Sequence, residues 1–149
     1  MSGHIIDTFE AVAQLVDNIA KATTAPLIFI DLEGINLSRH GSISIMQLLI
    51  PPSPVVYLID VLNLKANAFN TPGSKGQTLR TVLESDLYGK VFFDVRNDSD
   101  ALFAYFGVAI QGVEDVQLME SATRTTTRSR KYLNGLAKCF EKCALYDID

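Results

Sequence analysis

The protein has only two cysteines and two histidines in its 149 residues. A structural zinc site needs four closely spaced nitrogen or sulfur ligands, and His4 and His40 lie far along the chain from Cys139 and Cys143. Two cysteines four residues apart on a helix rarely have the geometry of a disulfide. We therefore expect neither a zinc site nor a disulfide, but two reduced thiols, as is usual for intracellular proteins.

The sequence also has no long hydrophobic run. Its longest apolar stretches, such as residues 26–30 and 48–52, are much shorter than the roughly 20 residues that a membrane-spanning helix requires. Residues 1–7 have neither the basic region nor the apolar region of a secretory signal. These absences predict an intracellular protein, in the cytoplasm or the nucleus, without a membrane partner.

The overall composition is that of an ordinary globular domain. Apolar residues make up 48% of the chain and charged residues 20%, which excludes a disordered chain and a collagen-like fibre. A chain of 149 residues has the usual length of one domain, and it contains no internal repeat. We therefore expect residues 1–149 to form a single domain.

The spacing of the hydrophobic residues predicts the order of helices and strands. Helical spacing predicts helices at residues 8–21, 78–85, 97–106 and 132–143. Apolar segments with β-branched residues predict strands at residues 27–33, 42–49, 55–61, 90–94 and 113–117. The short connections between the first three strands favour an antiparallel meander. The predicted class is α/β, with a mixed sheet flanked by helices, in which residues 90–94 run parallel to residues 27–33.

Helix ends and one connecting segment carry more specific signals. Asn97 or Asp98 is expected to cap the helix that ends at Gly107. Residues 67–77 are rich in proline and glycine and are predicted to form a surface loop. The last helix is expected to pack inward through Leu133, Leu136, Cys139 and Phe140.

Asp31 and Glu33 are the acidic residues that stand out from this pattern. They alternate with Leu32 at the end of a predicted buried strand, so both carboxylates point to the same face. Burying two carboxylates is unfavourable unless they are paired or bind a metal, and Mg²⁺ and Mn²⁺ prefer carboxylate oxygens. The alternative is that both residues are simply solvated at the strand end beside Gly34.

A second acidic cluster, at residues 94–100, follows another predicted strand. A carboxylate near the start of a helix has a structural explanation, because it accepts hydrogen bonds from free N–H groups. The combination favours a functional interpretation, since a mixed sheet can place the ends of two buried strands side by side. We therefore predict that Asp31, Glu33 and Asp98 lie within a few ångströms of one another and bind Mg²⁺ or Mn²⁺.

These segments resemble a known family. Residues 28–48 (IFIDLEGINLSRHGSISIMQL) resemble the first motif of the DEDD 3′–5′ exonucleases. The resemblance is to the branch that includes ribonuclease D, the Werner-type exonuclease domains and the eukaryotic exonuclease-domain-containing proteins. Residues 90–120 (KVFFDVRNDSDALFAYFGVAIQGVEDVQLME) resemble the second motif, and the register of Phe106 and Gly107 places its metal-binding aspartate at Asp98. Residues 131–143 (KYLNGLAKCFEKC) resemble the helix that follows.

The resemblance implies a ribonuclease H-like fold and two-metal hydrolysis of phosphodiester bonds with Mg²⁺ or Mn²⁺. It implies that Asp31 bridges both ions, that Glu33 binds one and orients the water, and that Asp98 binds the other. The family's third motif, a Tyr or His followed by a fourth Asp, is expected on a later helix. Tyr146 and Asp149 are too close together to replace it. We therefore expect a domain that is incomplete at its C-terminus and weakly active or inactive.

Basic residues gather in the last part of the chain. Four of them lie among Ser and Thr residues and are predicted to contact a phosphate backbone: Arg124, Arg128, Arg130 and Lys131. The alternative is that they belong to a solvated loop. The predicted partner is single-stranded RNA or DNA. The alternative function is a catalytically silent module that binds nucleic acid or protein, or that acts as a homodimeric adaptor through an exposed apolar surface.

Overall fold

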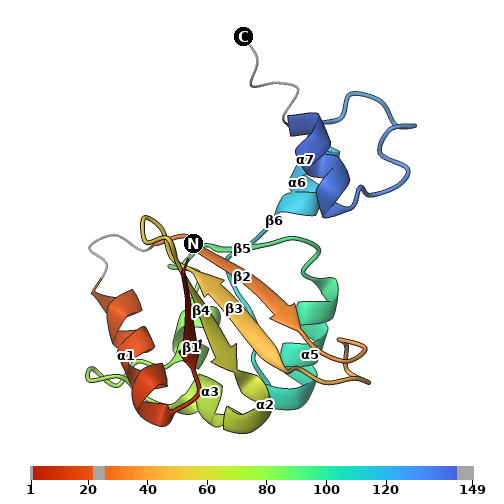
Figure 1. The fold of residues 1–149 in the computed structure, drawn as a ribbon. Helices are drawn as coiled ribbons and strands as arrows, with labels where there is room; N and C mark the ends of the chain where they lie inside the picture. Colours follow the sequence, from red (N-terminus) through yellow and green to blue (C-terminus); the bar gives the residue numbers. More distant parts are fainter. Residues whose placement is uncertain (1, 22–25, 144–149) are drawn as a thin grey trace.

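The computed structural model of the protein describes residues 2–21 and 26–143 (Figure 1). Tyr146 and Asp149, which are too close together to replace the third motif, lie outside the described residues, as does the side chain of Cys143. None of the described helices is both long and apolar enough to cross a membrane.

The centre of the fold is a mixed sheet of six strands in the order β1-β4-β3-β2-β5-β6. The strands are β1 (Ser2–Ile6), β2 (Ile28–Glu33), β3 (Ile45–Leu49), β4 (Val55–Asp60), β5 (Lys90–Phe92) and β6 (Val113–Asp115). β2, β3 and β4 form the predicted antiparallel meander, and β5 runs parallel to β2 beside it. The predicted α/β class and mixed sheet are therefore confirmed. β1 was not expected; it pairs in parallel with β4 and takes the edge position.

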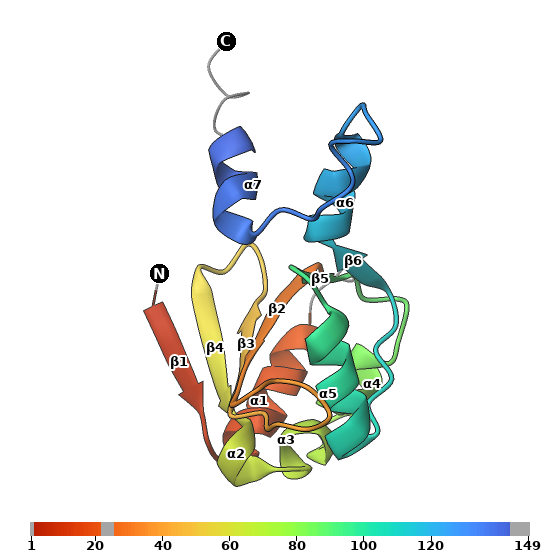
Figure 2. The same cartoon turned by 90° about the vertical axis from the view of Figure 1, so that its right-hand side faces the viewer.

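The helices leave one face of the sheet open. They are α1 (Phe9–Ala20), α2 (Val61–Leu64), α3 (Asn67–Asn70), α4 (Leu79–Leu83), α5 (Arg96–Phe106), α6 (Val116–Thr123) and α7 (Leu136–Cys143). Figure 2 shows α1, α3, α4 and α5 on one side of the sheet and α7 at the end of the other side. In β2 the residues that face the covered side, Ile28, Ile30 and Leu32, are 4% exposed or less. Asp31 and Glu33 are exposed on the open face.

The start of the segment 67–77 is a helix, so the prediction of a loop is wrong there. In α3, Ala68 and Phe69 are completely buried. The ring of Phe69 packs against that of Phe106 in α5, with 4.7 Å between ring centroids. A contact with a residue far along the chain holds this helical turn in place, and the local composition carries no signal for it.

α5 begins at Arg96, earlier than predicted, and Val95, the residue at its N-cap position, makes no side-chain capping hydrogen bond. Asp98 lies inside the first turn instead of preceding it, and its carboxylate accepts hydrogen bonds from its own backbone and from that of Leu32 in β2. Asp94, with φ of 63°, turns the chain from β5 into the helix. As predicted, Gly107 ends the helix, with φ of 63° in the left-handed region.

α6 and α7 stand beyond one end of the sheet (Figure 1). α7 begins at Leu136, later than predicted. Of the side chains expected to pack inward only Cys139 is buried, whereas Leu136 is 49% exposed and Phe140 is 67% exposed. The expected inward packing is therefore wrong for most of this helix, because α7 faces the sheet across an open groove instead of packing directly on it.

Candidate active site

Asp31 and Glu33 lie on the open face of β2 near its end, as the alternation of the strand requires. β5 pairs with β2 only at Ile28 and Phe29, so no described strand covers that edge of β2 beside the two carboxylates. Burial, together with the charge of Glu33, raises the pKa of Asp31 above its usual value. The two acidic residues thus lie at an edge that another element can reach.

Asp98 reaches this edge from the first turn of α5. It is only 7% exposed. Burial, with the charges of Asp31 and Asp94, raises the pKa of Asp98 to about 6, although hydrogen bonds from the backbone of Asp98 and Leu32 act in the opposite direction. The Oδ1 atom of Asp98 is buried without a hydrogen-bond partner among the described residues.

The structure therefore places Asp98 of α5 close enough to Asp31 of β2 for the charge of Asp31 to raise its pKa, and Glu33 lies beside Asp31 on the same face. A buried carboxylate without a hydrogen-bond partner is costly to ionise, and its oxygen is a preferred ligand atom for a hard divalent cation. The chemistry of these donors fits Mg²⁺ or Mn²⁺. In the described part of the chain, however, no three His, Cys, Asp or Glu side chains form a group that could hold a metal ion as they stand. Binding by all three carboxylates stays a prediction.

Gln47 is a further polar residue of the site, which the sequence pattern did not single out. It lies directly opposite Asp31 in the pairing of β2 with β3. Its Nε2 donates a hydrogen bond of 3.3 Å to Oδ2 of Asp31. The alternation of β3 places Gln47 on the open face, so the strand pattern contained the signal that could have found it.

A groove with a volume of about 490 Å³ lies between the open face and α7. Leu136 and Phe140 of α7 line it on one side, and Asp31 and Gln47 line it on the sheet. The other residues that line it are apolar or aromatic: Phe29, Ile30, Leu48, Leu49, Val56, Val91, Phe92, Phe93 and Val116. A mostly apolar groove with a few polar groups is typical of a ligand-binding site.

Asp115 connects α6 with the turn that precedes α5. Its side chain accepts hydrogen bonds from the backbone N–H groups of Asp94 and Val95, both 3.1 Å, of Gln117, 2.9 Å, and of Leu118, 3.4 Å. The same carboxylate therefore caps α6 and holds the chain just before Asp98. The sequence pointed to Asp115 only through the second-motif resemblance, because its hydrogen-bond donors come from two separate segments.

Replacing Asp115 with alanine is expected to lower the free energy of unfolding by roughly 2–4 kcal/mol, because four backbone N–H groups lose their acceptor. Urea denaturation followed by circular dichroism measures this loss. Glu114→Ala is the matched control, since Glu114 is the exposed neighbour on the same strand. Equal losses in the two variants would contradict the structural role of Asp115.

Arg124 does not face solvent as the predicted phosphate contact requires. Its side chain is 8% exposed and pairs with Glu120. It also donates hydrogen bonds to the carbonyl oxygens of Ser129 and Tyr132, at 2.5 and 2.6 Å. Arg124 therefore holds the segment between α6 and α7 together, and the nucleic-acid hypothesis no longer includes it.

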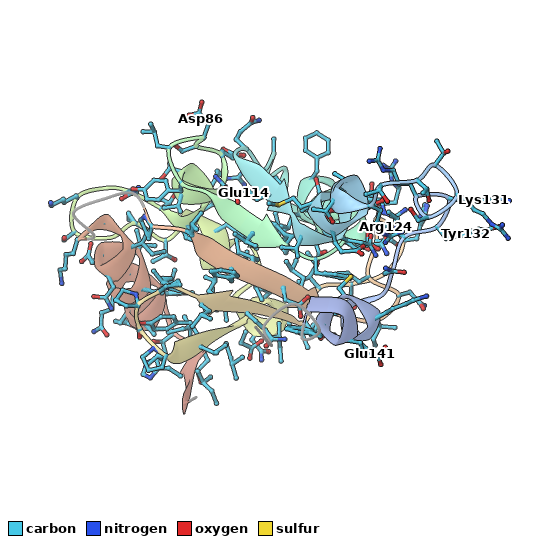
Figure 3. The ribbon with its side chains drawn as sticks, turned by 90° about the horizontal axis from the view of Figure 1, so that it is seen from above. Asp86, Glu114, Arg124, Lys131, Tyr132 and Glu141 are labelled. Carbon is cyan, nitrogen blue, oxygen red and sulfur yellow. The ribbon has the colours of Figure 1, made fainter. Side chains whose placement is uncertain are left out.

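Arg128, Arg130 and Lys131 are exposed on the segment between α6 and α7. Figure 3 shows Lys131 at the outer part of this segment, beyond Arg124. Arg130 also donates from Nε to the carbonyl oxygen of Arg124 at 2.7 Å. Phosphate contact stays a prediction for these three residues, whose placement permits it.

Changing both Arg128 and Lys131 to alanine is expected to weaken binding to single-stranded RNA about threefold to tenfold at low salt, because two charges that release counterions are lost. Fluorescence anisotropy with a labelled oligonucleotide at several salt concentrations measures the change. A variant with Lys21 and Lys75 changed to alanine is the control, because it alters the net charge equally at exposed positions elsewhere. Equal weakening in both variants would indicate a general charge effect.

Comparison with known proteins relates this site to nucleases. A family model described as 3′–5′ exonuclease matches residues 4–149. The mouse piRNA biogenesis protein EXD1 is 33% identical over 88 residues, which are 59% of this chain and 14% of that protein. The complex of Trypanosoma brucei RNase D with GMP has a TM-score of 0.78 and 28% identity, covering 96% of this chain and 42% of that chain.

Two further solved structures support the same fold. RNase D from Trypanosoma brucei in complex with RNA U12 has a TM-score of 0.69 and 30% identity, covering 81% of this chain and 39% of that chain. Escherichia coli RNase D is similar in fold, with a TM-score of 0.70 and 20% identity over 100% of this chain and 35% of that chain. The predicted ribonuclease H-like sheet is thus the sheet of RNase D-like exonucleases. The chain spans less than half the length of each of these relatives.

Proposed function

Because the chain belongs to the 3′–5′ exonuclease family, we propose that it shortens single-stranded RNA or DNA from the 3′ end at a divalent-metal site. The observation that carries this proposal is the meeting of Asp31 and Asp98, where Oδ1 of Asp98 is buried without a hydrogen bond from the described residues. RNase D from Trypanosoma brucei was solved with RNA U12, so RNA is the first substrate to test.

Asp31, Glu33 and Asp98 are the residues that would hold Mg²⁺ or Mn²⁺. When bound, such cations activate a water molecule and stabilise the charge on the leaving oxygen. The carboxylates have to be ionised to act as ligands. Since burial raises the pKa of Asp98 to about 6, protons compete for this ligand as the pH falls toward 6.

The groove beside Asp31 takes the 3′-terminal nucleotide in this proposal. Phe93 and Phe140 line the groove, and aromatic rings stack on nucleobases of any sequence. Arg128 and Lys131, exposed beyond α6, contact backbone phosphates further along the strand. Together these contacts hold the terminal phosphodiester near the carboxylates, which lowers the entropic part of the barrier.

A catalytically silent module that binds nucleic acid is the second candidate. The observation that favours it is that no three metal-binding side chains in the described part of the chain form a ready site. In that case the groove and the exposed cations bind RNA, and hydrolysis is slow or absent because an ion is poorly held.

A time course with Mn²⁺ on single-stranded RNA and DNA labelled at the 5′ end separates the two candidates. An exonuclease gives products shortened stepwise from the 3′ end, and Asp31→Ala abolishes them. Asp86→Ala is the control, because Asp86 is an exposed carboxylate far from α7 (Figure 3). Binding without shortened products supports the silent module, and neither binding nor products would overturn both candidates.

A further inference from the structure

The loop between β2 and β3 has a fixed shape and leads directly out of the candidate site. It begins one residue after Glu33, at Gly34. It closes on itself because the backbone N–H of Ser42 donates to the carbonyl of Ile35 at 2.9 Å. A Cβ atom on Gly41 would lie 2.0 Å from a backbone oxygen of the same loop, so no side chain fits there. The loop is therefore preformed.

Arg39, within this loop, binds Asp100 of α5 through both its backbone and its side chain. Its backbone N–H donates to Oδ2 at 2.9 Å, its Nε donates to Oδ1 at 2.8 Å, and its Nη2 also donates to Oδ1. Tyr105, further along α5, donates its hydroxyl to the carbonyl oxygen of Gly41. We call the contacts of Arg39, Asp100 and Tyr105 the loop latch. Figures 1 and 2 show this loop lying beside α5.

The loop latch joins the two elements that carry the carboxylates. Asp31 and Glu33 precede the loop on β2, and Asp98 lies two residues before Asp100 on α5. The pairing of β2 with β5 ends at Phe29, so strand hydrogen bonds no longer fix the distance at the level of the site. The loop latch connects the end of β2 with α5 at the level of the site, where β2 is no longer paired with β5.

We propose that the loop latch positions the divalent-metal site by holding Asp98 at the distance from Asp31 that a shared cation needs. This inference rests on the proposed function. An exposed ion pair alone contributes little to stability, and the side chain of Arg39 is 63% exposed. The latch nevertheless combines a backbone N–H with a rigid guanidinium fork, which sets direction as well as distance. Because the latch acts on the spacing between Asp31 and Asp98, its effect falls on metal affinity.

Mn²⁺ binding to the metal-free chain, measured by the loss of the free-Mn²⁺ signal in electron paramagnetic resonance, tests this inference. Arg39→Ala is expected to raise the dissociation constant about tenfold. Tyr105→Phe changes no charge and removes one hydroxyl, and it is expected to raise the constant about threefold. Arg39→Lys retains the charge and the backbone hydrogen bond, so its constant falls between those of the wild type and Arg39→Ala.

Arg96→Ala is the matched control for charge. Arg96 forms a similar pair with Asp94, at 2.6 and 2.8 Å, but within one short stretch of chain. Losing either arginine removes a positive charge near the carboxylates, which by Coulomb's law alone tightens Mn²⁺ binding. The loop latch predicts the opposite sign for Arg39→Ala.

The outcomes separate the inference from the proposed function. If the wild type does not bind Mn²⁺, the proposed function fails and the inference fails with it. If the wild type binds and both Arg39→Ala and Tyr105→Phe bind as tightly or more tightly, only the inference is overturned. If Arg39→Ala does not fold, Tyr105→Phe and Arg39→Lys decide the question once circular dichroism shows that they are folded.

Discussion

An Asp98→Asn variant is expected to gain stability relative to the wild type as the pH rises, and to lose most of the stabilisation by Mn²⁺. Burial raises the pKa of Asp98 from its ordinary value of 3.8 to about 6. A carboxyl group whose pKa is higher in the folded state than in the unfolded state contributes to the free energy of unfolding. This contribution is complete at a pH below the pKa of the unfolded state, and it is lost as the pH rises through the pKa of the folded state. Asparagine carries no charge that must be buried, so it avoids this loss.

Thermal and urea unfolding at pH 5 and pH 8 measure the effect. The advantage of Asp98→Asn over the wild type is expected to grow by roughly 1 kcal/mol between these pH values, after allowance for screening by solvent. Excess Mn²⁺ reverses the order at pH 8, because the wild type gains more free energy from binding than the variant does. Glu114→Gln, at an exposed carboxylate, is the control. A difference that does not change with pH, or equal stabilisation of both proteins by Mn²⁺, would contradict the assignment of Asp98.

Lys90→Ala is expected to lower the free energy of unfolding by about 3–5 kcal/mol, from a cavity and from two carbonyl groups that lose a donor. Lys90 is completely buried in β5. Its Nζ donates to the carbonyl oxygens of Val82, at 3.4 Å, and of Ser85, at the end of α4. Burial lowers the pKa of Lys90, although the charge of Asp86 opposes this shift. The ammonium group thus ties the sheet to the helical layer.

Lys90→Met is the comparison that separates the two causes of this loss. Methionine fills most of the volume of lysine but donates no hydrogen bond, so its loss is expected to be smaller than that of alanine. Urea denaturation at pH 7 measures both variants. A loss below about 1 kcal/mol for alanine, the size of an ordinary surface effect, would show that the ammonium group contributes little.

The sequence predicted the parts of this protein that depend on neighbours in the chain. The meander and the parallel place of β5 follow from hydrophobic alternation and from the intervening helix. The same alternation placed Asp31 and Glu33 on one face of β2, and Gly107 ended α5 as its conformational freedom suggests. Motif resemblance led to the exonuclease family, which the match over residues 4–149 confirms.

Contacts between distant segments decided the remaining features. α3 forms because Phe69 meets Phe106, a pairing that the composition of residues 67–77 does not reveal. Arg124 is turned inward because Glu120 and two carbonyl groups surround it. Gln47 did not stand out in the sequence. The acidic cluster at residues 94–100 includes Asp100, but its pairing with Arg39 was not predicted, because Gln47 and Asp100 each act on a partner in another element.

Taken by itself, the sequence determined which side chains share a strand face and which family they belong to, because periodicity and motifs are local properties of the chain. The tertiary structure alone decided which charged groups are buried and what lies beside them. Asp98 shows the reason: the start of α5 meets the end of β2 only when the sheet is assembled. Burial there, next to Asp31, changes an ordinary acid into one whose pKa is about 6.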